Sequence, residues 1–322
     1  MLRLGLLSTA RINDEILAAA AESRRVEAVA VASRDPERAR AYARERGIPR
    51  WHVSYDDLLA DPDVDAVYVS LPNGLHHEWT MRSLAAGKHV LCEKPYSRRP
   101  AEVEEAFDTA AAVGLVLMEA FMYRHHPQTE LVARLVREGA LGRLVSIAAS
   151  FSFRLDDPGN IRAQPDLDGG ALMDVGCYCV SGARLLAGEP LAATAVQVTG
   201  STGIDTSLYG TMRFDRDVVA QLAASFAAPR RQQLEIVGEE GVLRVGAPWR
   251  VDWAGSVELD RGGGTETLDV PEANSYARQL ENLADAIEGV APALLGRDDA
   301  LGQARAIDAL YRAAASGRTE AV

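Results

Sequence analysis

The sequence predicts an α/β protein in which an N-terminal parallel sheet precedes an α+β domain built on a large, mainly antiparallel sheet. Up to about residue 120, short apolar runs alternate with helical stretches, which is typical of βαβ units. Between about residues 191 and 270, short strands follow one another without a helix between them, which favours antiparallel pairing. The length of 322 residues fits two domains of roughly 150 residues each. We therefore expect a first domain over residues 1–120 and a second over residues 121–322.

The first half contains the strands and helices of a parallel sheet. The expected strands are Leu2–Leu7, Val26–Ala32, Val64–Ser70, Lys88–Cys92 and Leu115–Met118. The helices expected between them are Ile12–Ala21, Asp35–Arg46, His76–Ala86 and Pro100–Val113. Gly47, Gly87 and Gly114 follow three of these helices directly, as is common at helix C-termini. Ligands of such sheets bind across the carboxyl ends of the strands, so residues just after each strand are candidates for a binding site.

The second half combines four helices with a series of short strands. The expected helices are Gln128–Glu138, Leu172–Leu186, Ser275–Glu288 and Ala300–Ala315. The expected strands are Leu144–Phe153, Ala192–Val198, Ser207–Phe214, Val218–Phe226, Arg231–Val237, Gly241–Val245, Ser256–Leu259 and Thr265–Val270. Since the helix over 172–186 is apolar, we expect it to be largely buried.

Composition and charge disfavour several classes of protein. Acidic residues outnumber basic residues by 46 to 34, and the net charge of −12 argues against a nucleic-acid partner. No apolar stretch approaches the roughly 18 residues of a membrane span, and the N-terminus is typical of a strand rather than a signal peptide. Three cysteines cannot form a disulfide framework, which indicates a reducing compartment. We expect a cytoplasmic enzyme or small-molecule sensor with no membrane partner.

The turn after the first strand lacks the usual glycine-rich fingerprint of dinucleotide sites. Where G-x-G-x-x-G is normally found, this chain reads Ser8-Thr9-Ala10-Arg11-Ile12-Asn13. Small residues at positions 8–10 still permit a close approach of a ligand, and hydroxyl groups can donate to a phosphate at a helix N-terminus. Taken alone, this window is equally compatible with an ordinary strand-to-helix turn.

The end of the second strand indicates which dinucleotide such a fold prefers. An acidic residue there favours NAD, whereas Ser33 followed by Arg34 suits the 2′-phosphate of NADP. Asp35 comes one position later, beside Pro36, and is expected to cap the next helix. A solvated surface charge is the alternative interpretation of Arg34. The pattern predicts a preference for NADP(H), with NAD(H) as the alternative cofactor.

Four polar segments depart from what core packing requires. They are Cys92–Pro95, Glu119–Pro127, Arg154–Arg162 and Gly169–Tyr178. The first places Lys94 at the carboxyl end of a strand, either in a ligand crevice or, as for most lysines, in solvent. The second segment gathers two histidines beside Tyr123 and Arg124, and an aromatic domain hinge is its alternative interpretation. The third segment is compatible with an active-site lid, and taken alone it favours a surface loop.

The last of these segments contains an unusual carboxylate. Asp174 and Tyr178 are four residues apart, so one face of the expected helix presents both side chains. A carboxylate in an apolar helix is costly unless it is paired or used in chemistry, and a buried structural aspartate is the alternative. Metal binding is not expected, because Cys177 and Cys179 point to different sides of the helix and no histidine pair follows at zinc-finger spacing.

Five motifs occur along the chain in a characteristic order. They are Arg11-Ile12, Leu71-Pro72-Asn73 with His76, Glu93-Lys94-Pro95, Glu119-Ala120-Phe121-Met122-Tyr123-Arg124, and Gly169-Gly170 followed by Asp174-Val175-Gly176 and Tyr178. Together they resemble the glucose–fructose oxidoreductase/inositol dehydrogenase (Gfo/Idh/MocA) family, and the resemblance covers essentially the whole chain. A tyrosine four residues after the aspartate is similar to the branch of dimeric dihydrodiol dehydrogenase and NADP-linked xylose dehydrogenase.

The resemblance implies an N-terminal Rossmann domain and an NAD(P)-dependent oxidoreductase. Its members transfer a hydride between a nicotinamide and a hydroxyl or carbonyl group of a sugar, sugar derivative or polyol. Lys94 matches the family's catalytic lysine, Tyr178 its proton-transferring residue and Asp174 the carboxylate of the same helix. An ammonium group stabilises a nearby phenolate, so Lys94 would help Tyr178 to take up the proton. The alternatives are a non-catalytic NADP-sensing regulatory protein and a redox-assisted glycosidase of the same family.

The same resemblance implies the remaining site residues and the assembly. Residues on the cofactor side are Ser8, Thr9, Ala10, Arg11, Ile12, Ser33, Arg34, Leu71, Pro72, Asn73, His76, Glu93, Lys94 and Arg124. Residues that we expect to shape the substrate pocket are Tyr123, His125, Arg154, Asn160 and Arg162. The exposed face of the antiparallel sheet would pair with another subunit, giving a homodimer or homotetramer.

Overall fold

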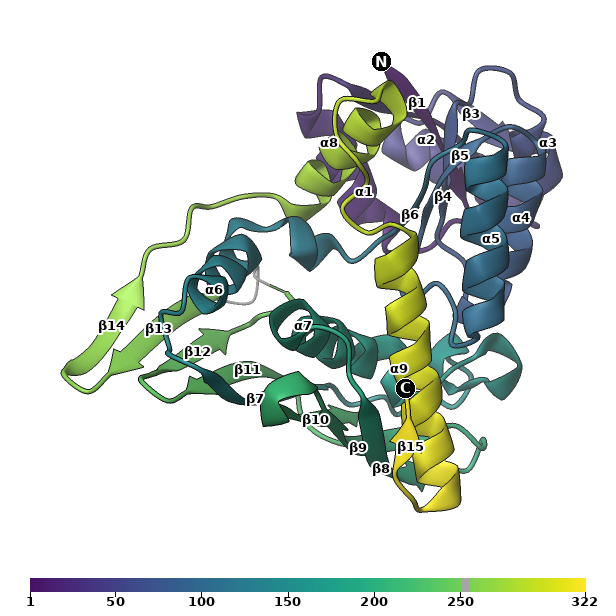
Figure 1. The fold of residues 1–322 in the computed structure, drawn as a ribbon. Helices are drawn as coiled ribbons and strands as arrows, with labels where there is room; N and C mark the ends of the chain where they lie inside the picture. Colours follow the sequence, from purple (N-terminus) through teal and green to yellow (C-terminus); the bar gives the residue numbers. More distant parts are fainter. Residues whose placement is uncertain (251–254) are drawn as a thin grey trace. The chain divides into compact units, whose positions relative to one another are not determined.

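The computed structural model describes residues 1–250 and 255–322, and the chain forms two compact units (Figure 1). Unit 1 consists of residues 1–122 and 274–301, and unit 2 of residues 123–273 and 302–322.

The segment 274–301 belongs to unit 1, whereas the division made from the sequence placed it in the second domain. Its helix α8 (Ser275–Glu288) lies against helix α1 (Asn13–Glu22). Arg25, just beyond α1, forms ion pairs with three carboxylates of α8. Contacts between segments far apart in the sequence therefore decide this assignment, and periodicity carries no information about them.

Unit 1 is built on a six-stranded parallel sheet with the order β3-β2-β1-β4-β5-β6. The strands are β1 (Leu2–Leu7), β2 (Val26–Ala32), β3 (Arg50–His52), β4 (Ala66–Val69), β5 (His89–Cys92) and β6 (Leu117–Glu119). The predicted parallel sheet is confirmed. Strand β3 and helix α3 (Tyr55–Leu59) were not predicted, because elements of three and five residues are too short to show a periodicity. The strand order reverses between β1 and β4, and ligands of such sheets bind at this point.

The helices of unit 1 bury the strands of this sheet. They are α1, α2 (Pro36–Arg46), α3, α4 (His76–Ala85), α5 (Pro100–Ala112) and α8. Helix α4 packs beside α5, as α1 does beside α8 (Figure 1). All four residues of β4 have no exposed surface. Burial on both faces explains why the strands are continuous apolar runs rather than alternating ones.

Unit 2 is built on a nine-stranded sheet with the order β14-β13-β12-β11-β7-β10-β9-β8-β15. The strands are β7 (Leu144–Ser152), β8 (Ala192–Thr199), β9 (Asp205–Arg213), β10 (Val219–Ser225), β11 (Arg231–Gly238), β12 (Val242–Gly246), β13 (Ser256–Arg261), β14 (Gly264–Leu268) and β15 (Glu320–Ala321). Among these pairs only β7 and β10 run parallel, and the others are antiparallel. The predicted, mainly antiparallel sheet is therefore confirmed.

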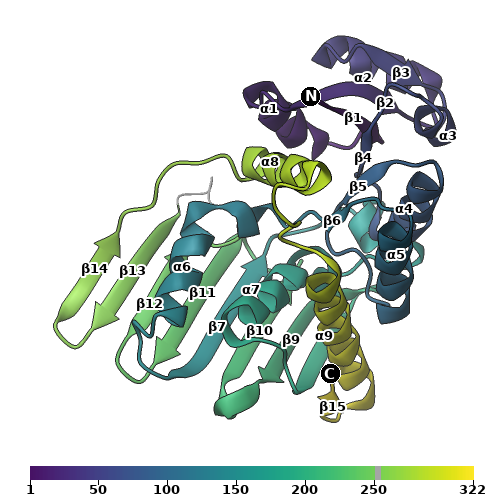
Figure 2. The same cartoon turned by 45° about the horizontal axis from the view of Figure 1, so that its top comes forward.

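One face of this sheet carries helices and the other is open. Helices α6 (Pro127–Arg137), α7 (Cys177–Ala187) and α9 (Arg297–Ser316) lie on the same side of the strands (Figure 2). The open face exposes apolar side chains such as Val196, Val198 and Tyr209. In the described ranges, no helix combines the length and the apolar character that a bilayer crossing requires.

Candidate functional site

The cofactor residues expected from the sequence mostly lie in four turns of unit 1. Ser8, Ser33, Ser70 and Glu93 directly follow β1, β2, β4 and β5, which are strands of one parallel sheet. The carboxyl ends of parallel strands share one edge, so these turns line the edge where ligands of this fold bind.

The first turn adopts a glycine-like conformation although it contains no glycine. Ser8 has φ of 142°, in the region that side chains rarely adopt. Its hydroxyl group lies 3.0 Å from the Ser70 carbonyl oxygen, to which it donates, and accepts from the Ala10 N–H at 3.1 Å. Helix α1 begins five residues later with no side-chain cap on its first N–H groups. The turn thus has, at Ser8, the positive φ that glycine supplies in the glycine-rich fingerprint.

The turn after β2 carries a hydroxyl group and a helix cap. Ser33 is buried, and its Oγ accepts from the Asp35 N–H at 3.2 Å. The Asp35 carboxylate accepts from the N–H groups of Glu37 and Arg38, at 3.0 and 3.2 Å. The prediction that Asp35 caps the second helix is confirmed. Its carboxylate is therefore engaged with α2.

Arg34 has a second arginine beside it that sequence analysis missed. Burial raises the pKa of the Tyr55 hydroxyl, and Arg34, which hydrogen-bonds that hydroxyl, and Arg38 both oppose the rise. Two guanidinium groups thus influence the Tyr55 hydroxyl. Guanidinium groups and hydroxyl groups are donors that suit a phosphate dianion. Arg38 lies in α2 whereas Arg34 precedes the Asp35 cap, so no helical spacing linked the two arginines in the sequence.

Lys94 lies in a turn whose neighbouring residues are fixed. The hydroxyl of the buried Tyr68 donates to Glu93 Oε1, and the Glu93 N–H donates to the carbonyl of β4 at 3.0 Å. On the other side of Lys94, the Tyr96 N–H donates to Glu119 Oε1 at 2.7 Å. The Lys94–Pro95 peptide bond is cis. Partners on both sides of Lys94 therefore hold its backbone in one place.

His76 supports this turn from behind. The ring has no exposed surface, and its nitrogens lie 3.0 Å from the Pro95 carbonyl oxygen and 2.9 Å from that of Leu71. Burial lowers the pKa of His76. Its two ring nitrogens both face backbone carbonyl oxygens, and the neutral ring donates to one of them. His76 therefore packs between the turns after β4 and β5 rather than offering an atom to a ligand. Asn73 lies between these turns, in the short helix Asn73–Leu75 that follows Pro72.

In unit 2, the predicted carboxylate is paired with a predicted substrate residue. Arg162 Nε donates to Asp174 Oδ2 at 2.8 Å, and the Asp174 side chain is 16% exposed. Asp174 lies in a π-helical turn, Leu172–Gly176, that precedes α7, where a single α-helix was expected. Such turns are frequent at functional sites because they shift side chains out of the regular register.

The start of this π-helical turn is held by a residue that sequence analysis missed. Asp205 is buried, accepts the Leu172 N–H at Oδ2 (2.7 Å), and accepts the Tyr311 hydroxyl at Oδ1 (3.0 Å). A Cβ atom on Gly170 would lie 2.1 Å from Asp205 Oδ1, and one on Gly169 would lie 2.4 Å from the Arg162 carbonyl oxygen. The two glycines are therefore required by this close packing, and no sequence pattern marked Asp205.

Tyr178 lies among aromatic rings. Its ring centroid is 5.8 Å from that of Tyr123, 5.5 Å from Phe151 and 6.3 Å from Trp249, and the residue is 7% exposed. The Tyr123 hydroxyl donates to Ser181 Oγ at 2.8 Å. Tyr123, a predicted substrate residue, is itself buried, so it forms the wall behind Tyr178. The aromatic rings fix the position of the Tyr178 ring.

The other predicted residues of unit 2 lie in three different settings. Arg124 Nη1 is 3.5 Å from Ser181 Oγ, and His125 is buried. Arg154 is exposed and pairs with Asp156 at 2.7 Å. Asn160 caps the short helix that contains Arg162 by accepting its N–H at 3.1 Å. The structure thus brings Arg162 to Asp174 and Tyr123 to Tyr178. Arg154 and Asn160 instead form contacts within their own loop.

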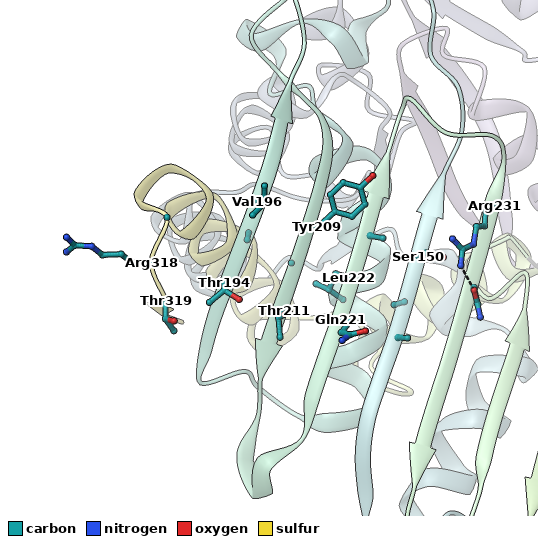
Figure 3. Close-up of a pocket in the computed structure, with 17 residues that line it drawn as sticks. Ser150, Thr194, Val196, Tyr209, Thr211, Gln221, Leu222, Arg231, Arg318 and Thr319 are labelled. Carbon is teal, nitrogen blue, oxygen red and sulfur yellow. Dashed lines mark hydrogen bonds between the residues drawn. The ribbon is translucent and has the colours of Figure 1, made fainter.

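A cavity of about 660 Å³ lies on the open face of the sheet of unit 2 (Figure 3). Val196, Tyr209, Leu222 and Arg231 are among the residues that line it. None of the predicted site residues is among its lining residues. The cavity belongs to the uncovered sheet surface, and Asp174 and Tyr178 lie elsewhere.

Two family models match the chain. Residues 2–121 match a family described as "Oxidoreductase family, NAD-binding Rossmann fold", and residues 129–244 match "GFO/IDH/MocA C-terminal domain".

Similar proteins include D-xylose 1-dehydrogenase (NADP(+)) 2 of Haloferax volcanii, 42% identical over 97% of both chains. Trans-1,2-dihydrobenzene-1,2-diol dehydrogenase of Xenopus tropicalis is 32% identical over 75% of this chain and 74% of its own length. Among solved structures, a 3-ketoreductase from Actinomadura kijaniata in complex with NADP and TDP-benzene is 33% identical, with a TM-score of 0.92 over 97% of both chains. The chain therefore belongs to the Gfo/Idh/MocA family of oxidoreductases.

Proposed function

We propose that this chain is an NADP(H)-preferring oxidoreductase that interconverts a hydroxyl and a carbonyl group of a sugar, sugar derivative or other polyol. The observation that carries the proposal is in unit 2, where one helical segment presents Asp174, paired with Arg162, and Tyr178, set among aromatic rings. A sensor that only binds the cofactor requires neither group. The 42% identity to an NADP-dependent xylose dehydrogenase supports the same conclusion.

The cofactor side is supported by the turns of unit 1. The backbone between Thr9 and Ile12, before α1, would hold the pyrophosphate, and Ser33, Arg34 and Arg38 would hold the 2′-phosphate. NADP, when bound, supplies the hydride chemistry of the reaction. Lys94, at the carboxyl end of β5, lies on the nicotinamide side in this assignment.

The protein's own contribution is proton transfer and orientation. In oxidation, the Tyr178 phenolate takes the proton of the reacting alcohol, and in reduction the Tyr178 hydroxyl returns it. Asp174, oriented by Arg162, accepts a hydrogen bond from a neighbouring substrate hydroxyl. Lys94 takes the role of the family's catalytic lysine, which contacts the reacting hydroxyl from the nicotinamide side. Such acid–base help contributes about 10²- to 10⁴-fold in rate.

The open face of the sheet of unit 2 is the proposed contact between subunits in a homodimer or homotetramer. Val196, Val198 and Tyr209 are 69%, 53% and 51% exposed there, which is unusual for three large apolar residues on neighbouring strands. Light scattering should give the molar mass of a dimer or tetramer. Val196→Asp should lower the measured mass toward that of a single chain. A monomeric wild-type protein would contradict the proposal.

The experiment that tests the activity is a parallel titration with NADPH and NADH, followed by turnover of sugars and polyols with NADP. We expect tight NADPH binding, weaker NADH binding and oxidation of at least one sugar in the panel. Tight binding without any turnover would favour the NADP-sensing alternative, and release of sugar from a glycoside would favour the redox-assisted glycosidase. Binding of neither nucleotide would contradict the proposed function.

A further inference from the structure

We infer that Asn13 is a positioning residue for the cofactor, because its side-chain amide clamps a turn whose first residue, Ser8, adopts a conformation that glycine normally supplies. The inference rests on the proposed binding of the pyrophosphate at this turn. It assigns a role to the two positions at which this chain departs most clearly from the glycine-rich fingerprint.

Ser8 is held by groups on three sides. Its backbone φ of 142° costs free energy for any residue except glycine, because the Cβ atom crowds the backbone. Its hydroxyl group lies 2.9 Å from Ser70 Oγ and 3.0 Å from the Ser70 carbonyl oxygen. The Ala10 N–H donates to the same hydroxyl at 3.1 Å. A strained residue persists only where its surroundings fix it, and these contacts fix the side chain of Ser8.

Asn13 fixes the backbone of Ser8. Its Nδ2 donates to the Ser8 carbonyl oxygen at 2.8 Å across the turn. Asn13 has no exposed surface, and within the described part of the chain its Oδ1 accepts no hydrogen bond. A buried acceptor without a donor destabilises the fold, and an alanine would avoid that cost at the first residue of α1. The amide therefore adds nothing to helix stability that alanine lacks. Its Nδ2 binds the Ser8 carbonyl oxygen, and the side chain also interacts with the Tyr42 hydroxyl.

The two residues form a coupled pair. Without the Asn13 amide, the Ser8 carbonyl loses its donor and the serine can relax to negative φ. We expect this relaxation to reorient the backbone N–H groups between Thr9 and Ile12, which are proposed to hold the pyrophosphate. With glycine at position 8, the same conformation needs no support, so the amide becomes dispensable.

A double-mutant cycle tests the coupling with the variants Asn13→Ala, Ser8→Gly and their combination. We expect Asn13→Ala to weaken NADPH binding about tenfold. Ser8→Gly supplies the second background of the cycle, and its own NADPH dissociation constant is the reference there. In that background Asn13→Ala should cost less than about threefold. An equal loss in both backgrounds, or no loss in either, would overturn the inference.

Urea unfolding of the same four proteins provides a readout that is independent of the cofactor. Asn13→Ala should lower the urea midpoint more in the wild-type background than in the Ser8→Gly background, and equal shifts would overturn the inference. If the wild-type protein binds no nucleotide, the proposed function fails. The unfolding cycle still measures the coupling between Asn13 and Ser8. The matched control is Asn274→Ala, which removes the helix cap of α8 in the same unit. It should lower the midpoint without changing NADPH affinity.

Discussion

The proposed cofactor edge of unit 1 and the proposed catalytic segment of unit 2 are built in different ways. The cofactor edge of unit 1 consists of turns that directly follow buried parallel strands, and their backbone groups are fixed by buried partners such as Tyr68, His76 and Glu119. The catalytic segment of unit 2 instead depends on side chains that meet across long stretches of sequence, such as Asp205 with the Leu172 N–H. Strand order alone therefore places the first half, whereas the second depends on individual pairings.

The largest effect is expected in unit 2, at the residue assigned to proton transfer. Tyr178→Phe keeps the ring among its aromatic neighbours but removes the hydroxyl, so kcat should fall about 10²- to 10⁴-fold. NADPH affinity should be unchanged, because the cofactor turns are in unit 1. Stopped assays of turnover and a fluorescence titration measure the two quantities. Tyr209→Phe, on the open face of the sheet, is the control and should keep full turnover. Unchanged turnover in Tyr178→Phe would remove this residue from the mechanism.

A second test changes the proposed cofactor residues of unit 1 and leaves unit 2 intact. Arg34→Ala and Arg38→Ala should each weaken NADPH binding by about 10- to 100-fold, since each removes a charged hydrogen bond to the 2′-phosphate. NADH binding should not change, because NADH lacks this phosphate. Arg40→Ala removes another arginine of α2, one that pairs with Glu37, and should affect neither nucleotide. An equal loss of NADPH and NADH affinity in Arg34→Ala would contradict the 2′-phosphate assignment.

A smaller effect is expected at the start of the π-helical turn. Asp205→Ala removes the acceptor of the Leu172 N–H, and the resulting shift of Asp174 should lower kcat/KM about tenfold. Tyr311→Phe removes only the second contact of Asp205, so its effect should be about threefold or less. Steady-state kinetics with the preferred sugar measure both. A loss of NADPH affinity in place of kcat/KM would contradict the separation of the halves.

The smallest effect concerns the stability of unit 1 in acid. The Arg3 guanidinium hydrogen-bonds Asp65 at 2.7 and 3.0 Å and holds the pKa of this carboxyl below its usual value. The contact therefore stabilises the folded state above about pH 4, and this contribution is lost as the pH falls through the lowered pKa. Both groups are partly exposed, so Asp65→Asn should cost less than about 1 kcal/mol at pH 7. Urea unfolding at pH 7 and at pH 3 should show a smaller difference between the variants in acid.

The sequence predicted most of the fold because its strands are buried on both faces and its helices carry clear end signals. Strands β1 and β2 and helix α8 have the predicted bounds. Sequence analysis missed β3, which is short, and the placement of residues 274–301, which depends on contacts between distant segments. The parallel pairing of β7 with β10 also depends on distant contacts.

For the site, positions after strands were predictable and partners were not. Ser33, Arg34 and Lys94 follow from strand ends and motif spacing. The partner of Asp174 is Arg162, which lies in an irregular loop, and Asp205 opens a strand with no local pattern around it. The hydrogen bond between Asn13 and Ser8 was also not predictable, because the absence of the glycine-rich fingerprint does not show which contacts replace its glycines.

The discontinuity of unit 1 affects how the protein is made on the ribosome. The strands and helices up to residue 122 are synthesised first, but helix α8, which covers α1, is complete only when residue 288 has been added. At ~5–20 residues per second, the apolar side of α1 waits for roughly 10 to 30 s for its cover. During this interval the nascent chain presents the uncovered side of α1, so chaperone demand should be highest before unit 2 is finished. A gene fragment that ends at residue 122 encodes the same uncovered state permanently.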